Sequence, residues 1–235
     1  MSAAERLAQL ALGYRLAADA APRFGRLLEL LESDPRAPSS VTASAAAVDR
    51  HVADSLSALE IAPLRAARQI ADIGSGAGFP GLVLAIALPQ ARITLLESVG
   101  RRCEFLERAR VATGTTNAAV VCARAEAWSA GLAQHDIATA RALGPLALLC
   151  EYAAPLLVIG GRLIAWKGKV SRVEQAAGDR AAGELGLEAA GVIRSRPYPG
   201  SEEHHLHIYA KTAATPIRFP RRPGAARKRP LGDRR

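Results

Sequence analysis

Four closely spaced glycines give the strongest chemical signal in the chain. They lie in the stretch ADIGSGAGFPG and fit two different spacings. Gly76, Gly78 and Gly81 match G-x-G-x-x-G, which dinucleotide-binding enzymes place after their first strand. Gly74, Gly76 and Gly78 match G-x-G-x-G preceded by Asp72, an arrangement typical of sites for S-adenosylmethionine (SAM). The first spacing predicts hydride transfer and the second predicts methyl transfer.

Two carboxylates near this stretch help to choose between the spacings. Both kinds of site need a tight turn from strand to helix, where glycine permits positive φ and close approach of a ligand. Asp72 precedes the turn and is expected to point into the ligand crevice, where it would lie badly beside a pyrophosphate. Glu97 ends the next strand, 21 residues after Gly76, and could accept from both ribose hydroxyls in either class. Asp72 therefore favours SAM.

The periodicity of the chain changes near residue 66. Before that point, apolar residues recur at three- and four-residue spacing, which predicts helices. From Arg68 onward, short apolar runs alternate with helical segments and predict an α/β fold with a mainly parallel, doubly wound sheet. The last two strands follow one another without a helix and predict an antiparallel hairpin. The expected strands cover residues 67–74, 91–98, 117–123, 135–142, 160–168, 191–198 and 204–212.

The charge is uneven along the chain and suggests a separate C-terminal region. The net charge is +9, and residues 216–235 hold eight basic side chains and one acidic one, which leaves +2 for the rest. Four prolines there disfavour helix and central strand. We expect a helical cap over 1–65, an α/β domain over 66–213, and a disordered basic tail over 214–235 that binds nucleic-acid phosphates.

Other classes of protein are not favoured. No uninterrupted apolar stretch is long enough to span a membrane. Alternation along the last predicted strand puts only His205 and His207 on one face, and no cluster of acids or cysteines completes a site, so no metal site is expected. Reduced, mostly buried thiols of a cytoplasmic protein are expected for the three widely spaced cysteines, Cys103, Cys122 and Cys150.

Several motifs occur together in a characteristic order. They are DIGSGAGFPG, LLESVGRRCEFLERA, ARAEAW, ARALGPL, AWKG and EEHHLHIYAK. In this combination, over roughly residues 20–212, the chain resembles the glucose-inhibited division protein B family, also called RNA small subunit methyltransferase G. The stretch TPIRFPRRPGAARKRPLG resembles the extension of actinobacterial members.

The resemblance implies a seven-stranded SAM-dependent methyltransferase fold with an N-terminal helical cap. It implies methyl transfer to N7 of guanine-527 in the 530 loop of 16S ribosomal RNA, with that RNA or the small subunit as partner. His51 and Asp54 match a histidine motif of the family. The expected SAM-binding residues, from the resemblance and the spacing together, are Asp72, Gly74, Gly76, Gly78, Phe79, Glu97, Ala125, Glu126 and Arg141.

Guanine N7 has a lone pair and no proton, so its methylation requires no general base, and no catalytic side chain is expected. Arg141 is expected to act by positioning, on the methionine carboxylate or a phosphate. Removal of the tail is expected to leave SAM affinity unchanged, because no tail residue belongs to the glycine turn. Expected RNA contacts are Lys167, Arg218, Arg221, Arg222, Arg227, Lys228 and Arg229.

Two other functions remain open from the residues. One is a nicotinamide-dependent oxidoreductase that uses the same turn in its G-x-G-x-x-G spacing. The other is a non-catalytic RNA-binding protein that retains a SAM fold.

Overall fold

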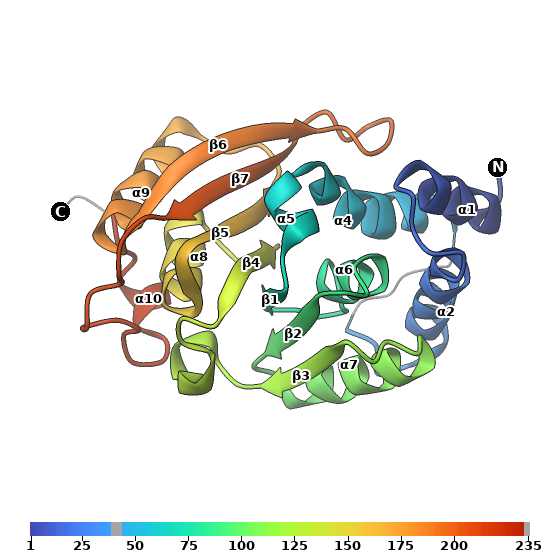
Figure 1. Ribbon diagram of the computed structural model, residues 1–235, viewed down its shortest axis with the longest axis horizontal. Helices are drawn as coiled ribbons and strands as arrows, with labels where there is room; N and C mark the ends of the chain where they lie inside the picture. Colours follow the sequence, from blue (N-terminus) through green and yellow to red (C-terminus); the bar gives the residue numbers. More distant parts are fainter. Residues whose placement is uncertain (39–43, 233–235) are drawn as a thin grey trace.

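Seven strands form one sheet in the order β3-β2-β1-β4-β5-β7-β6 (Figure 1). The computed structural model describes residues 1–38 and 44–232. The strands are β1 (Gln69–Ile73), β2 (Arg92–Glu97), β3 (Ala118–Cys122), β4 (His135–Arg141), β5 (Leu157–Lys167), β6 (Leu187–Ser195) and β7 (His204–Lys211).

The first five strands are parallel, and the last two form the expected antiparallel hairpin. β1 pairs with β2 on one side and with β4 on the other, so it lies at the centre of the parallel part. The chain order reverses there, and this is where ligands bind in open α/β sheets. β7 runs antiparallel between β5 and β6. The predicted fold class is confirmed.

Helices cover both faces of the sheet and enclose two apolar cores. The first core joins the N-terminal cap, α6 (Gly81–Ala87) and α7 (Gly100–Ala112) to one face. The second joins α8 (Leu146–Ala153) and α9 (Arg172–Glu184) to the other. The cap consists of α1 (Ala3–Gly13), α2 (Ala20–Ser33), α3 (Ala45–Ala47), η1 (Val48–Ala53), α4 (Asp54–Leu56), η2 (Ser57–Glu60) and α5 (Ala62–Ala66).

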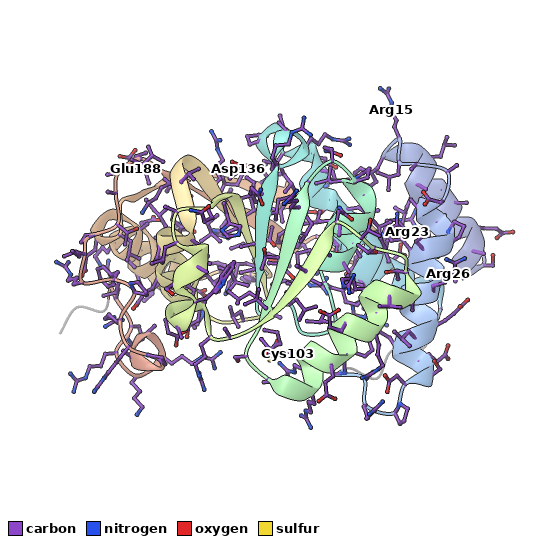
Figure 2. All side chains as sticks on the ribbon, turned by 60° about the horizontal axis from the view of Figure 1, so that its bottom comes forward. Arg15, Arg23, Arg26, Cys103, Asp136 and Glu188 are labelled. Carbon is purple, nitrogen blue, oxygen red and sulfur yellow. A yellow bond between two sulfur atoms is a disulfide. The ribbon has the colours of Figure 1, made fainter. Side chains whose placement is uncertain are left out.

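Arg23 fastens the cap to the sheet domain. From α2, its guanidinium donates to the carbonyl oxygens of Thr113 and Gly114, at 2.8 and 3.2 Å, where α7 ends. Figure 2 shows Arg23 on α2 beside this helix. These carbonyls lie past the last helical turn and lack intrahelical partners. The contact therefore satisfies them and, at the same time, fixes the N-terminal cap against the end of α7.

The C-terminal segment differs from the predicted disordered tail. Over its described part, residues 214–232, Phe219 and Ala226 are buried in the second core, and a short helix, α10 (Ala225–Lys228), lies beside α8 (Figure 1). Arg221 forms a two-pronged ion pair with Glu151 of α8. The prolines limit regular secondary structure here, as predicted. The segment is nevertheless ordered, because buried apolar side chains and the ion pair with Glu151 attach it to the domain. Residues 233–235 of the predicted tail lie outside the described residues.

No helix within the described ranges is both long and apolar enough to cross a membrane.

Candidate active site

The turn between β1 and α6 is built on glycines in the left-handed region. Gly74, Gly76 and Gly78 have φ values of 72°, 54° and 92°, which L side chains rarely adopt. A Cβ on Gly74 would lie 2.7 Å from a methyl carbon of Leu143, across the pocket. Gly81 has another task, since its Cβ would lie 2.5 Å from the Asp72 carboxylate. Three glycines therefore shape the turn, and the fourth lets α6 pack on β1.

The sequence analysis predicted that Asp72 points into the ligand crevice, but in the structure Asp72 lies beneath the turn. Its carboxylate accepts from the Thr139 hydroxyl at 2.8 Å and from the Gly81 amide at 3.2 Å. Only 1% of the residue is exposed, and burial raises the pKa of Asp72 to about 6, against these hydrogen bonds. The structure thus gives Asp72 a positioning role, which joins the turn and the first residue of α6 to β4.

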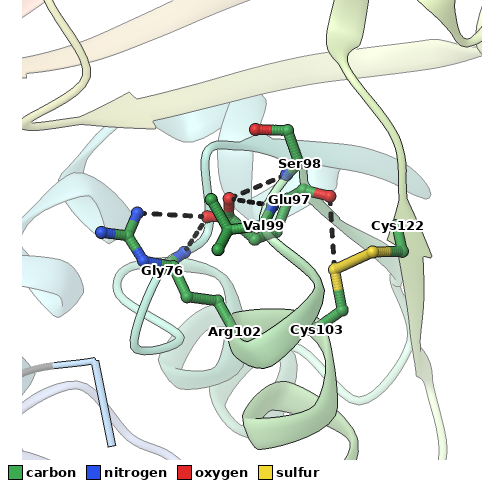
Figure 3. Close-up of a disulfide and its surroundings, with 7 residues drawn as sticks. All are labelled: Gly76, Glu97, Ser98, Val99, Arg102, Cys103 and Cys122. Carbon is green, nitrogen blue, oxygen red and sulfur yellow. Dashed lines mark hydrogen bonds and ion pairs between the residues drawn. A yellow bond between two sulfur atoms is a disulfide. The ribbon is translucent and has the colours of Figure 1, made fainter.

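Glu97 fixes the far side of the same turn (Figure 3). One carboxylate oxygen accepts from the amides of Ser98 and Val99 at 2.7 and 2.9 Å, and the other accepts from the Gly76 amide at 3.1 Å. Arg102 lies 3.8 Å from that second oxygen. A carboxylate offers about four lone-pair positions, so the oxygen facing Gly76 can accept from a further donor. A ribose hydroxyl is such a donor.

A small pocket extends from the turn along the ends of β1, β2 and β3. Ala125 and Glu126, two of the predicted SAM-binding residues, lie in a single 3-10 turn, η3 (Ala125–Ala127), that follows β3. The two sides of the pocket come from segments distant in sequence. Its lining consists of Ile73, Gly74, Leu96, Ser98, Ala123, Arg124, Ala125, Glu126, Leu143, Tyr152 and Arg227.

A larger cleft of about 480 Å³ lies at the carboxyl ends of β4 and β5. Asp54, from the cap, is 5% exposed and is bound on two sides. Its oxygens lie 2.9 Å from Nη1 of Arg141 and 2.9 Å from Nδ1 of His204. The indole of Trp166 donates to the Asp54 carbonyl at 2.9 Å. Asp54 of the cap thus contacts side chains from β4, β5 and β7 at the cleft.

Phe79 connects the glycine turn to this cleft. Its ring stacks on His51 with 4.7 Å between centroids, and the Arg141 guanidinium lies 5.4 Å from the same ring. Burial, with the nearby charges of Arg141 and Arg50, lowers the pKa of His51 to about 4. His51 is therefore neutral at physiological pH.

The fold is shared with SAM-dependent methyltransferases of known structure. SAM-dependent methyltransferase SibL, in its apo form, superimposes with a TM-score of 0.55 at 16% identity, over 68% of this chain and 55% of that one. Fibrillarin from Aeropyrum pernix, in complex with natively bound SAM, gives 0.54 at 18% identity, over 67% and 73%. At these identities the likeness establishes the fold.

Sequence similarity decides the family. A family model described as rRNA small subunit methyltransferase G matches residues 37–195. The chain belongs to this family. A Rubrobacter xylanophilus protein named ribosomal RNA small subunit methyltransferase G is 43% identical over 187 residues, which is 77% of this chain and 72% of that one. A protein of the same name from Synechococcus elongatus is 39% identical over 199 residues, or 82% and 81%.

One sequence prediction about this member of the methyltransferase G family is wrong. Cys103 and Cys122 form a disulfide between α7 and β3, with Cα atoms 5.8 Å apart (Figure 3). The Sγ of Cys103 also lies 3.4 Å from the carbonyl oxygen of Glu97. Their separation of 19 residues gave no local signal, because only the packing of α7 beside β3 brings them together. Cys150 is a buried free thiol, as predicted.

The predicted RNA-binding residues fall into two groups in the structure. In the first group, the charged side chain already has a partner within the protein. The Lys167 ammonium is occupied by the Gly144 carbonyl at 3.0 Å and by Glu174 at 2.7 Å, although the residue lines the large cleft. Arg218 and Arg221 are paired with Glu184 and Glu151. The second group is exposed at the surface of the C-terminal segment and consists of Arg222, Arg227, Lys228 and Arg229.

Sequence reasoning assigned only Gly74, Ala125 and Glu126 of the residues that line the small pocket to the cofactor site, and three of the others need comment. Leu143 comes two residues after Arg141, so its place after β4 could have suggested it. Tyr152 lies in α8 and Arg227 in α10, and neither has a local signal. These two reach the pocket only because α8 and the C-terminal segment pack together.

Among residues 1–38 and 44–232, no group of three or more His, Cys, Asp or Glu could hold a metal ion.

Proposed function

We propose that this protein transfers a methyl group from SAM to N7 of guanine-527 in the 530 loop of 16S ribosomal RNA. Membership of the methyltransferase G family supports the reaction and the kind of RNA. The observation with most weight is Phe79, which ends the glycine turn and contacts His51 and Arg141 of the large cleft. A cofactor at the turn and a base in the cleft would therefore be neighbours.

The residues around the turn fit SAM. The three positive-φ glycines leave space that Cβ atoms would fill, and Glu97 keeps acceptor capacity for the ribose hydroxyls. Ala125 and Glu126 would meet the adenine, where a carboxylate can accept from the exocyclic amine. When bound, SAM supplies a methyl group activated on a sulfonium. Asp72 would act indirectly, by holding the turn.

The cleft residues suit a base that gains positive charge. Guanine N7 has a lone pair and no proton, so the protein has mainly to orient the base and exclude water. A cation close to N7 would oppose the reaction. The Arg141 charge is balanced by Asp54 at 2.9 Å, and His51 is neutral because burial lowers its pKa to about 4. The two side chains that contact Phe79 therefore add little net positive charge beside the base.

The partner would be 16S ribosomal RNA or the small subunit, in the cytoplasm. Lys167 at the cleft would bind its phosphates, together with the outward basic residues of the C-terminal segment, Arg222, Lys228 and Arg229. The alternative of a nicotinamide-dependent oxidoreductase has no support from the family match.

The decisive experiment is mass spectrometry of 16S ribosomal RNA from a deletion strain. We expect the methyl group on guanine-527 N7 to disappear and to return with the intact gene. A gene for the Glu97→Ala variant should restore it poorly, because loss of a hydrogen bond to a charged group costs about 1.5–3 kcal/mol. Unchanged methylation in the deletion strain would favour a non-catalytic RNA-binding protein instead. Binding assays with SAM and with NAD(H) test the oxidoreductase alternative.

A further inference from the structure

The C-terminal segment crosses the adenine side of the cofactor pocket. Arg227, in α10, lines the pocket together with Glu126 of η3 and Tyr152 of α8. The Gly224 amide, just before α10, donates to Oε1 of Glu126 at 2.9 Å. These contacts join residues about one hundred positions apart in the sequence, and they were not expected from the glycine turn alone.

The segment is anchored on both sides of these contacts. Before them, Phe219 is 8% exposed in the second core, and Arg221 is paired with Glu151, whose side chain is 3% exposed. After them, the Arg180 guanidinium donates twice to the Gly232 carbonyl, at 2.8 and 2.6 Å. The part of the segment that faces the pocket is thus fixed to the domain by contacts both before and after it.

Each contact has a role that adenine recognition requires. A carboxylate already oriented by an amide loses less freedom when it accepts from an adenine amine. The Gly224 amide orients Glu126 in this way. Arg227 faces the Tyr152 hydroxyl, where its hydrogen bond opposes the increase in the Tyr152 pKa that burial causes. A planar guanidinium held at the mouth of the pocket can stack on a planar base.

We propose that the docked C-terminal segment forms the outer wall of the adenine pocket and sets the affinity for SAM. Gly224 orients Glu126, and Arg227 closes the mouth over the adenine. Docking of the segment and binding of SAM therefore stabilise one another, because a coupling between two binding events is reciprocal. The proposal rests on SAM as the cofactor. It replaces the expectation that the tail is irrelevant to SAM affinity.

The first test measures SAM binding by calorimetry. Arg227→Ala should raise the Kd about tenfold, which corresponds to about 1.4 kcal/mol. Lys228→Ala is the matched control, since it removes the same charge from the same short helix but lies on the outer hollow formed by the segment. It should change the Kd less than about twofold. S-adenosylhomocysteine should show the same difference, because the adenine end is common to both ligands.

The second test measures the reverse effect, protection of the segment by SAM. Trypsin can cleave after Arg227 and Lys228, whereas Arg222 and Arg229 precede prolines and resist cleavage. Saturating SAM should slow cleavage at the first two bonds severalfold in the full chain. This readout needs no truncated protein and no RNA.

The outcomes separate this proposal from the proposed function. A full chain that fails to bind SAM would contradict the function itself. The other outcome is a full chain that binds SAM, with the same Kd in Arg227→Ala and in Lys228→Ala and no protection from trypsin. That result would overturn only the proposal that the C-terminal segment forms a wall of the adenine pocket. Arg227 is exposed at the surface, so its replacement by alanine is not expected to prevent folding.

Discussion

Asp54 of the cap and Arg141 at the end of β4 form an ion pair of 2.9 Å, with side-chain exposures of 7% and 18%. The pair joins the helical cap to the sheet at the large cleft, where His204 approaches the other Asp54 oxygen. At this cleft, one carboxylate therefore links the cap to the sheet and orients Arg141.

Replacement of Asp54 should be costly for stability. Asp54→Asn leaves the Arg141 guanidinium largely buried without its counter-charge, and loss of one partner from a buried pair typically costs about 3 kcal/mol. Urea denaturation measures this free energy of unfolding. Glu107→Gln is the control, because its pair with Arg110 is far more exposed, and it should cost less than about 1 kcal/mol. Similar losses in the two variants would contradict the assigned role of the pair.

The glycine turn should distinguish two adjacent substitutions. Both Gly74→Ala and Gly76→Ala place a side chain at positive φ, which costs about 1–2 kcal/mol. Gly74→Ala also brings a Cβ to 2.7 Å from Leu143, whereas at Gly76 the nearest atom is 3.7 Å away. Gly74→Ala should therefore weaken SAM binding more, as measured by calorimetry with circular dichroism as the check on folding. Equal effects would show that Leu143 moves aside, and a larger effect at Gly76 would contradict the prediction.

The low pKa of His51 predicts a specific acid sensitivity. The unfolded chain protonates His51 near pH 6.5, but the folded protein does so only near pH 4. Between these values the unfolded state binds more protons, so the contribution of His51 to stability falls as pH falls. His51→Phe retains a ring against Phe79 and should lose less stability than the wild type from pH 7 to pH 4.5. Parallel stability curves for the two proteins would contradict this prediction.

The disulfide should contribute to stability under oxidising conditions. A bridge that closes a loop of this length stabilises a protein by about 3 kcal/mol in the chain-entropy model. The Cys103→Ser/Cys122→Ser variant should unfold at lower urea than the oxidised wild type. Reductant should lower the wild type to the same midpoint and leave the variant unchanged. Intact mass with and without thiol alkylation checks that the bridge is present at the start.

RNA binding should depend on salt through the outer face of the C-terminal segment. Residues 216–235 hold eight basic side chains, but Arg218 and Arg221 are paired internally. Each phosphate contact on single-stranded RNA contributes about −0.7 to the slope of log K against log salt. Alanine at the three outward positions should therefore reduce the slope by about 2; these are Arg222, Lys228 and Arg229. Lysine in place of the two arginines should preserve the slope, and an unchanged slope in the alanine variant would place RNA elsewhere.

Much of the fold follows from local sequence. Apolar periodicity predicted the strands and most helices, because burial of one face or of a whole strand leaves a repeat in the sequence. The apolar spacing, however, predicts one helix over residues 3–20, whereas α1 ends at Gly13. The glycine turn and Glu97 were found because both lie at strand ends, where parallel strands bring their carboxyl termini to one edge.

Only the tertiary structure decided the tasks of several of these residues. Asp72 was expected to meet the ligand, but the partners that bury it, Thr139 and Gly81, come from β4 and α6. The disulfide and the docking of the C-terminal segment depend on contacts between distant parts of the chain, and spacing or composition does not encode such contacts. By itself, the sequence determined the fold, the family and the cofactor turn. Packing buried Asp72 beneath the turn, and it placed Arg227 of the basic segment in the lining of the small pocket.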